Sequence, residues 1–374
     1  MTARARPLSI PMMTLSCLSP PSTIAREPRM ARPKIQIRDL TKVFGPKPDA
    51  ALAMLSQGIG KDEIFQRTGQ VVGVNKVGFD VQAGDIYVLM GLSGSGKSTL
   101  IRLINRLVEP TAGSVVIDGD DVARMPLPEL MRWRRKRIAM VFQSFALMPH
   151  RTVQDNVAFG LEVAGENPKR YRDKVMQALE QVGLKAYAAK YPRQLSGGMQ
   201  QRVGLARALA VDPDILLMDE AFSALDPLKR TEMQDLMLDL QREQRRTIVF
   251  VSHDLEEALK IGSKIAIMEG GNLVQEGSPH EIVTSPANDY VRRFFRGVDT
   301  SRYLTAADLV DRTVVPFPAG GTGRLRATTT LPETLDTVLG LDQPVSVFDD
   351  AERLVGCITP RSLLLKIAST RHAS

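Results

Sequence analysis

The sequence has little cysteine, few aromatic residues and no long apolar run. Its two cysteines, Cys17 and Cys357, lie too far apart in the sequence to indicate a metal site or a disulfide framework. No apolar stretch approaches the roughly 18 residues that cross a bilayer, so the chain is not expected to span a membrane itself. What remains is the composition of a soluble globular protein, with 43% hydrophobic and 24% charged residues in 374, enough for two domains.

The positive charge is unevenly distributed. The formal net charge is +7, and residues 1–33 contribute five arginines and one glutamate. The high isoelectric point therefore says little about the folded part and gives little support to nucleic-acid binding. The basic run Met131–Arg137 permits a nucleic-acid patch, but a solvated face is the more ordinary interpretation.

The N-terminal segment, residues 1–33, carries six prolines and shows no sustained periodicity. This predicts a disordered extension, and the alternative is a targeting signal with a basic start and an apolar patch. A strand pattern starts at Ile35, five residues after Met30. We therefore interpret Met30 as the true start of the protein.

One glycine-rich stretch, Gly91–Thr99, organises the rest of the chain. It follows the apolar run Ile86–Met90 and precedes a segment with helical spacing, and it matches the pattern G-x4-G-K-[ST]. Strand, glycine-rich turn and helix is the context of a phosphate-binding loop. The glycines let successive backbone N–H groups converge on one anion at a helix N-terminus, where the macrodipole also favours phosphate.

The loop predicts a nucleotide site that needs Mg²⁺. Lys97 is placed to reach the terminal phosphates, and the Ser98 hydroxyl to complete the shell of the metal ion. The predicted phosphate-binding residues are Gly91, Ser93, Gly94, Ser95, Gly96, Lys97, Ser98 and Thr99.

A second anion-binding helix start lies at Leu195–Arg202. Ser196 is a good N-cap, and Gly197 and Gly198 permit close approach of the backbone. One active site does not need two such cradles. We therefore expect the helix start at Leu195–Arg202 of each chain to complete the phosphate site of a second copy. The alternative is an ordinary capped helix.

Two buried strands are expected to bring polar groups to the same sheet edge. The apolar run Ile215–Glu220 ends in two carboxylates, as suits a parallel strand covered on both faces. We expect Asp219 to bind Mg²⁺ and Glu220 to orient and activate the attacking water. His253 follows the strand Thr247–Ser252, and we interpret it as a γ-phosphate contact; the alternative is a satisfied polar group at a strand end.

These motifs resemble, in the same order, those of ATP-binding-cassette (ABC) ATPases. The resemblance covers residues 34–298 and rests on the phosphate loop, Gln143, the LSGGMQQR motif, the LLMDE strand, Ser223–Asp226 and His253. It implies an α/β P-loop NTPase fold of the ABC type, with a mixed-sheet core and a helical subdomain at about residues 144–210.

The resemblance also implies individual roles. Phe44 stacks on adenine, although from the residues alone it is equally a core aromatic. Ser196 and Gly198 reach across to the ATP of the other subunit, and Gln143 senses the γ-phosphate and couples to the membrane partner. The implied catalytic residues are Gln143, Glu220, Asp226 and His253, and the implied Mg²⁺ ligands are Ser98, Gln143 and Asp219.

Four segments resemble the ATP-binding subunit of glycine betaine/proline importers: residues 46–70, Val141–His150, Met218–Pro227 and Asn288–Arg296. The resemblance implies an ATP hydrolase with ATP and Mg²⁺ as cofactors, peripheral at the cytoplasmic face of the inner membrane. Its expected partners are a second copy of itself, membrane permease subunits and, through the permease, a substrate-binding protein, with no nucleic acid. The alternatives are a choline, carnitine or methionine importer, a non-transport ABC ATPase, or a purely regulatory nucleotide-binding module.

The tail predicts a small second unit. Residues 299–330 read as a linker or irregular segment because of their prolines and clustered glycines. Residues 331–370 predict a compact α+β unit, in which Pro344–Thr359 resembles one cystathionine-β-synthase-type (CBS) repeat. Only one such repeat fits, so a partial unit that supports dimerisation and one with a sensing role both stay open. Its expected elements are helix Leu331–Leu339, strands Val345–Val347 and Leu354–Ile358, and helix Pro360–Ile367.

Overall fold

The computed structural model describes residues 32–144, 146–296, 298–299, 303–311, 323–341 and 343–365. The chain divides into a first unit, Met1–Arg32, and a second, Pro33–Ser374. The extension predicted at residues 1–33 therefore lies almost wholly outside the described residues.

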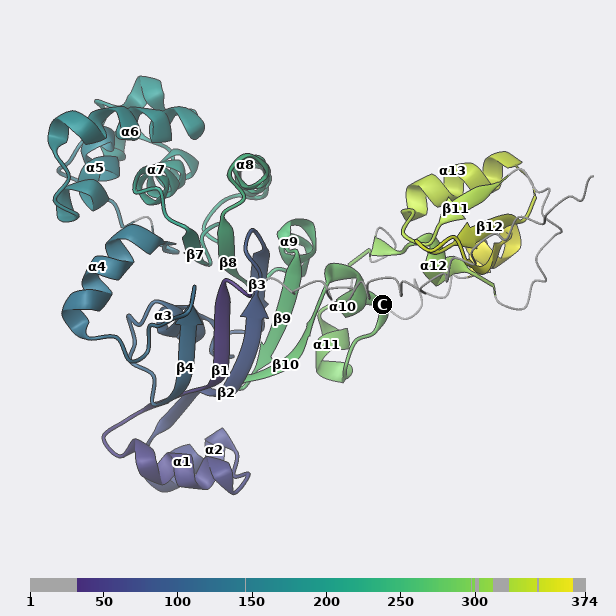
Figure 1. The fold of residues 1–374 in the computed structure, drawn as a ribbon, viewed down its shortest axis with the longest axis horizontal. Helices are drawn as coiled ribbons and strands as arrows, with labels where there is room; N and C mark the ends of the chain where they lie inside the picture. Colours follow the sequence, from purple (N-terminus) through teal and green to yellow (C-terminus); the bar gives the residue numbers. More distant parts are fainter. Residues whose placement is uncertain are drawn as a thin grey trace, which may run out of the picture. The chain divides into compact units, whose positions relative to one another are not determined.

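A six-stranded sheet forms the centre of the nucleotide-binding part (Figure 1). Its order is β10-β9-β3-β8-β7-β6, with β10 antiparallel at one edge and the other neighbours parallel. The strands β3, β7 and β8 are buried along their whole length, which confirms the prediction from their continuous apolar runs. The strands are β3 (Ile86–Met90), β6 (Ile138–Val141), β7 (Ile215–Asp219), β8 (Thr247–Ser252), β9 (Lys264–Glu269) and β10 (Asn272–Gly277).

A four-stranded antiparallel sheet, in the order β2-β1-β4-β5, gives the fold its mixed character. Asp118 and Gly119 form the turn between β4 and β5, with φ of 52° and 92°, the conformation that a tight hairpin requires. The first strand starts at Ile35, as its sequence pattern predicts, and reaches Phe44. The strands are β1 (Ile35–Phe44), β2 (Val71–Val81), β4 (Ala112–Ile117) and β5 (Asp120–Asp121).

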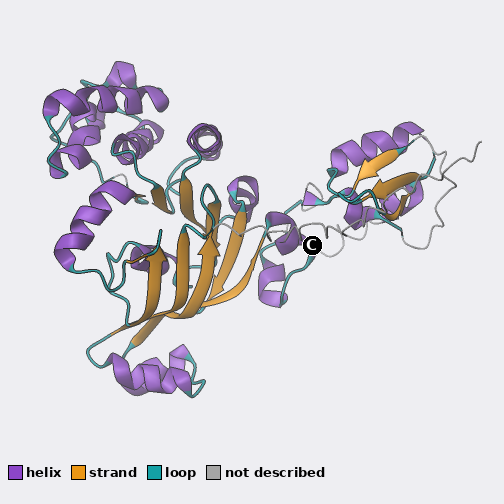
Figure 2. Ribbon diagram, in the orientation of Figure 1, coloured by secondary structure: helices purple, strands orange, loops and turns teal. Residues whose placement is uncertain are grey.

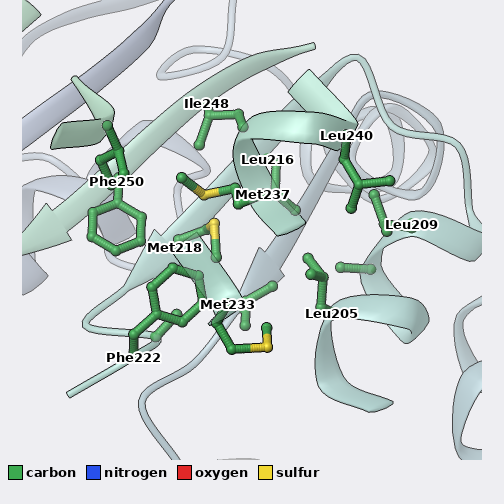
Figure 3. Packing of buried hydrophobic residues seen from close by; sticks show 14 of the residues in the cluster. Leu205, Leu209, Leu216, Met218, Phe222, Met233, Met237, Leu240, Ile248 and Phe250 are labelled. Carbon is green, nitrogen blue, oxygen red and sulfur yellow. The ribbon is translucent and has the colours of Figure 1, made fainter. Parts of the chain in front are cut away.

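Two hydrophobic cores lie on the two faces of the parallel sheet. Alternate residues of β3 belong to different cores: Val88 packs with the helices α5–α9, and Leu89 packs with α3 and the antiparallel sheet. Figure 3 shows part of the first core, where Met233 and Met237 lie against side chains of β7 and β8. The helices are α3 (Lys97–Ile104), α4 (Leu127–Arg137), α5 (Val153–Val163), α6 (Pro168–Gln181), α7 (Gly197–Ala210), α8 (Pro227–Gln244), α9 (Leu255–Ile261), α10 (Pro279–Thr284) and α11 (Asp289–Arg293).

The predicted helical subdomain is present as α5, α6 and α7, which pack against one another (Figure 2). Its first helix, α5, starts at a reciprocal capping box formed by Thr152 and Asp155. Gly183, with φ of 71°, follows the end of α6.

The segment at residues 46–70, an insert between β1 and β2, forms two short helices, α1 (Pro48–Ser56) and α2 (Lys61–Thr68). They bury Ala51 and Ile64 against Val43 and Val72 in a small core of their own. The insert is therefore anchored to the strand that ends at Phe44.

The basic run on α4 is only partly the solvated face that we predicted. Arg134 donates to the backbone carbonyl of Asn105 at 2.7 Å, and Arg137 donates to Asp214 at 2.6 Å. Arg132, Arg135 and Lys136 are exposed. The run therefore also fixes α4 to its neighbours.

The C-terminal unit contains a three-stranded sheet in the order β11-β12-β13. Its predicted helix and both predicted strands are present, and residues 360–365 begin the last predicted helix, whose end at Ile367 lies outside the described residues. Residues 299–330 are not wholly irregular as we predicted, because Leu309 and Leu325 are buried in the same core as Val347. The elements are α12 (Ala306–Leu309), β11 (Arg324–Arg326), α13 (Leu331–Leu341), β12 (Val345–Phe348) and β13 (Leu354–Ile358).

Candidate active site

The glycine-rich loop joins β3 to α3 in a conformation that requires glycine. A Cβ atom on Gly96 would lie 2.3 Å from the carbonyl oxygen of Gly73, and one on Gly91 would lie 2.4 Å from that of Met268. Both glycines have positive φ. Backbone atoms of β2 and β9 thus lie so close to the loop that they leave no room for a side chain at these two positions.

Lys97 is buried at the start of α3, with 4% of its surface exposed. Its Nζ donates to the carbonyl oxygens of Gly91 at 2.7 Å and Leu92 at 3.0 Å. Burial lowers the pKa of Lys97, while the nearby charges of Glu220 and Asp219 oppose that shift. The loop therefore contains a cation held among backbone dipoles, where it can pair with phosphate oxygens.

Ser98 and Asp219 meet beside this cation. The Ser98 hydroxyl donates to Asp219 Oδ1 at 2.8 Å, and Arg102 donates to Oδ2 at 3.2 Å. A hydroxyl and a buried carboxylate are hard oxygen ligands that suit Mg²⁺, with phosphate and water completing its octahedron. Within the described ranges no group of three or more His, Cys, Asp or Glu side chains could hold a metal alone. The pair fits an ion that arrives with a nucleotide.

Glu220 stands at the centre of a second polar group. Its Oε2 accepts from Gln143 Nε2 at 3.3 Å and lies 3.7 Å from His253 Nδ1. The three side chains follow the carboxyl ends of β6, β7 and β8, which are neighbours in the parallel sheet. The structure therefore brings these predicted residues together at one edge, as expected for adjacent parallel strands.

The backbone at Glu220 is strained. Its φ is +48°, a conformation that non-glycine residues adopt rarely and at a cost of about 1–3 kcal/mol. Its backbone N–H donates to the Val251 carbonyl oxygen at 3.2 Å, and Gln143 also donates to Ser223 at 3.3 Å. These contacts hold the carboxylate in place between β7 and β8. Within the described residues no hydrogen bond connects Gln143 to Ser98 or Asp219, so its contacts lie on the Glu220 side.

The predicted second cradle is a helix start, as expected, but it is separate from the loop. Ser196 caps α7 by accepting from the Met199 N–H at 3.4 Å, and Asp226 caps α8 by accepting from Lys229 at 3.1 Å. Gly197 is the first residue of α7, and a Cβ on Gly198 would lie 3.2 Å from the Lys229 side chain. In the part of the chain that the structure describes, no hydrogen bond or ion pair joins this cradle to Gly91–Thr99.

Phe44 ends β1 and is 40% exposed, so it is not the core aromatic that was its alternative. The Nζ atom of Lys42 lies 5.0 Å from its ring centroid. A Cβ on Gly73 would approach the Phe44 ring to 2.8 Å and the Thr99 methyl group to 3.3 Å. The ring therefore stands beside the first turn of α3, where its exposed surface can stack on a base.

Two neighbours of the site were missed in the sequence. Tyr290 donates to the Met268 carbonyl oxygen at 3.0 Å and accepts from the Leu92 N–H at 3.4 Å, which links α11 to the phosphate loop. No local pattern marks this contact. Arg102 contacts Asp219, and its spacing of one helical turn from Ser98 was a usable signal.

This geometry defines a class of protein. The ABC transporter family model matches residues 74–223. Two solved structures of the ATP-binding cassette MJ0796, both dimeric and one bound to ADP and Pi, match with a TM-score of 0.56 at 30% identity, covering 66% of this chain and 98% of theirs. The chain belongs to the ABC transporter family of ATP-binding subunits, and it is an ATP hydrolase of that family. The predicted fold and enzyme class are confirmed.

The particular group follows from its relatives. The chain is 59% identical over 280 residues to the glycine betaine/proline betaine transport system ATP-binding protein ProV of Escherichia coli (strain K12), covering 75% of this chain and 70% of ProV. It is 53% identical over 289 residues to the glycine betaine/carnitine transport ATP-binding protein GbuA of Listeria monocytogenes, covering 77% and 73%. It is 46% identical over 239 residues to the methionine import ATP-binding protein MetN of Caulobacter vibrioides, covering 64% and 71%. The predicted resemblance to glycine betaine/proline importers is confirmed.

Proposed function

We propose that this chain is the ATP-hydrolysing subunit that energises import of glycine betaine/proline-type osmoprotectants through a separate membrane permease. The higher identity to glycine betaine transport proteins than to the methionine import protein supports this cargo. The observation that carries the chemistry is the Glu220 carboxylate between Gln143 and His253, one residue after Asp219.

Nucleotide binding rests on the phosphate loop. The backbone N–H groups of Gly91–Thr99 and the Lys97 ammonium bind the phosphates, and Phe44 stacks on adenine. Ser98 and Asp219, with Gln143 as the proposed third ligand, would hold Mg²⁺, which would neutralise negative charge on the phosphates. This arrangement leaves the γ-phosphate directed at the strand ends that carry Glu220 and His253.

Hydrolysis uses the second polar group. Glu220 accepts a hydrogen bond from the attacking water and orients it towards the γ-phosphate. His253, whose Nδ1 lies near the same Glu220 oxygen that accepts from Gln143, contacts the γ-phosphate. Asp226 caps α8 and so fixes the segment that follows Glu220. The contacts of Glu220 with Gln143 and His253 support its catalytic role; its positive φ alone does not, because eight other described non-glycine residues share that conformation.

A complete site takes two chains in this proposal. Ser196, Gly197 and Gly198 of a second copy close over the phosphates bound to Gly91–Thr99. The separation of these two cradles within one chain supports this arrangement, and so do the dimeric MJ0796 structures.

The remaining partners are membrane proteins. No described helix is both long and apolar enough to cross a bilayer. The relatives named as transport ATP-binding proteins support a peripheral place for the chain at the cytoplasmic face of the inner membrane. There the region around Gln143 contacts permease subunits, and a substrate-binding protein acts through them. The C-terminal unit, with its own core around Val347, is proposed as a partial CBS-like unit.

Reconstituted transport tests the cargo. The chain is co-purified with its permease and binding protein, and ATP-driven uptake into vesicles is measured for labelled glycine betaine, proline, choline, carnitine and methionine. We expect uptake of glycine betaine or proline, and none with Glu220→Gln. Faster uptake of methionine, choline or carnitine would contradict the proposed cargo, and ATP-independent uptake would contradict the proposed function.

A further inference from the structure

A buried carboxylate lies directly behind the strand end that carries His253. Glu257, in the first turn of α9, is 7% exposed. The Ser252 hydroxyl donates to its Oε2 at 2.5 Å, and Gln234 Nε2 donates to its Oε1 at 3.1 Å. Both carboxylate oxygens are thus occupied by protein groups, and the catalytic steps above do not use them.

The two donors belong to the two segments that carry site residues. Ser252 is the last residue of β8 and immediately precedes His253. Gln234 lies in α8, the helix that Asp226 caps. Glu257 therefore ties the His253 strand end to the helix that begins at Asp226.

A second bridge runs between the same segments. Arg230 of α8 donates to Asp254 Oδ2 at 3.0 Å and to the Leu225 carbonyl oxygen at 3.4 Å. Asp254 in turn caps α9 by accepting from the Glu257 N–H at 3.2 Å, and its own N–H donates to Ser252 Oγ at 3.0 Å. His253 is thus flanked by Ser252 and Asp254, whose side-chain oxygen atoms all form hydrogen bonds.

Hydrophobic packing of α8 and α9 does not by itself require a carboxylate at position 257. The neighbouring face of α8 packs through Met233 and Met237, which lie beside Phe222 and Phe250 in Figure 3. Burial raises the pKa of Glu257, against the effect of its bonds from Ser252 and Gln234. An apolar side chain would avoid this desolvation cost.

We propose that Glu257 is a positioning residue that sets the place of His253 relative to the α8 helix start. The inference rests on the proposed role of His253 at the γ-phosphate. Loss of the carboxylate frees the Ser252 hydroxyl and the Gln234 amide, and His253 then moves relative to Glu220. A displacement of about 1 Å of such a group lowers the rate of reaction up to roughly 100-fold.

The test measures ATP turnover and ATP affinity of the full-length chain under single-turnover conditions. Glu257→Ala is expected to lower the hydrolysis rate about 10- to 100-fold, with the Kd for ATP unchanged within about twofold. Glu257→Gln should recover most of the rate, because its amide still accepts from Gln234 and can donate to Ser252. If Glu257→Ala does not fold, Ser252→Ala removes the same bond with a smaller change and should lower the rate in the same direction.

A matched control separates positioning from helix attachment. Asp235→Asn breaks the ion pair of Asp235 with Lys260, 2.7 Å long, which joins α8 to α9 away from His253, and it should leave the rate unchanged within about twofold. A loss as large as that of Glu257→Ala would overturn the inference.

A double-mutant cycle decides whether Glu257 acts through His253. In a His253→Ala background, Glu257→Ala should change the rate by less than about twofold. A full additional loss in that background, or a wild-type rate in Glu257→Ala alone, overturns the inference and leaves the proposed function intact. A wild-type rate in His253→Ala overturns the proposed role of His253 and the inference with it.

Discussion

His253 Nδ1 lies 3.7 Å from Glu220 Oε2, although 32 residues lie between them in the sequence. They meet because β7 and β8 are adjacent parallel strands and both groups follow the carboxyl ends. Gln143 joins them from β6, the next strand in the sheet. The catalytic arrangement is therefore a consequence of strand order.

Removing the Glu220 charge should separate binding from hydrolysis. In Glu220→Gln we expect the ATP turnover rate to fall roughly 10²–10⁴-fold, because the amide cannot accept the proton of the attacking water. The Kd for ATP should hold within about threefold, since Lys97 and Ser98 are untouched. Rapid-quench hydrolysis and equilibrium binding on one preparation check this. Turnover near the wild-type rate would remove Glu220 from the catalytic role.

The phosphate loop should tolerate a methyl group at one glycine better than at another. Gly96→Ala places its Cβ 2.3 Å from the Gly73 carbonyl oxygen, whereas Gly94→Ala meets nothing within 4 Å. Both residues have positive φ, so both substitutions add a strain of about 1–3 kcal/mol. We expect Gly96→Ala to abolish measurable ATP binding and Gly94→Ala to weaken it modestly. Equal affinities, measured by titration calorimetry, would show that contact between β2 and the loop does not shape the site.

Phe44 should contribute base stacking. Phe44→Ala is expected to weaken the binding free energy of ATP by about 1–3 kcal/mol, because base stacking is lost. Phe44→Tyr should restore most of the affinity. Phe65→Ala in the neighbouring insert is the matched control, because Phe65 is a similarly accessible aromatic at 54% exposure. An equal loss in both variants, or none in Phe44→Ala, would argue against adenine stacking.

The buried Glu257 should leave a signature in the pH dependence of stability. Its pKa in the folded chain is raised above the ordinary value of 4.5, so the folded state binds this proton more tightly than the unfolded state. Its contribution is therefore fully present below about pH 4.5 and is lost as the pH rises through the folded pKa. Glu257→Gln has no ionisable group at this position, so its free energy of unfolding does not fall in this way as the pH rises. In denaturant titrations its stability relative to the wild type should therefore increase from pH 4.5 upwards. A stability difference that does not change with pH would contradict the raised pKa of Glu257.

Much of this site could be predicted from the sequence, because its parts are local. The β3–loop–α3 unit, the cap at Ser196 and the apolar run before Asp219 each carry a pattern within a few residues. The contacts between such parts had no local pattern. Tyr290 under the loop and Glu257 behind Ser252 depend on which elements become neighbours after folding.

The C-terminal unit also contains a strand that its own sequence pattern does not predict. The strand at Val345–Val347 alternates between buried and partly exposed side chains, but β11 has three residues and a single buried side chain, Leu325. Its pairing with β12 gives it strand structure, and a segment so short has no detectable period of its own.

In the proposed mechanism, one nucleotide site is built from two copies of the chain. Sedimentation of Glu220→Gln with ATP and Mg²⁺ tests it most directly, because slow hydrolysis traps the closed state. We expect a dimer, and a monomer when Ser196→Arg is added. Ser278→Arg is the control, since Ser278 caps α10 in the same way and each substitution loses about 0.5–2 kcal/mol of capping. A dimer that survives Ser196→Arg, or a monomer that hydrolyses ATP at the full rate, would contradict the account.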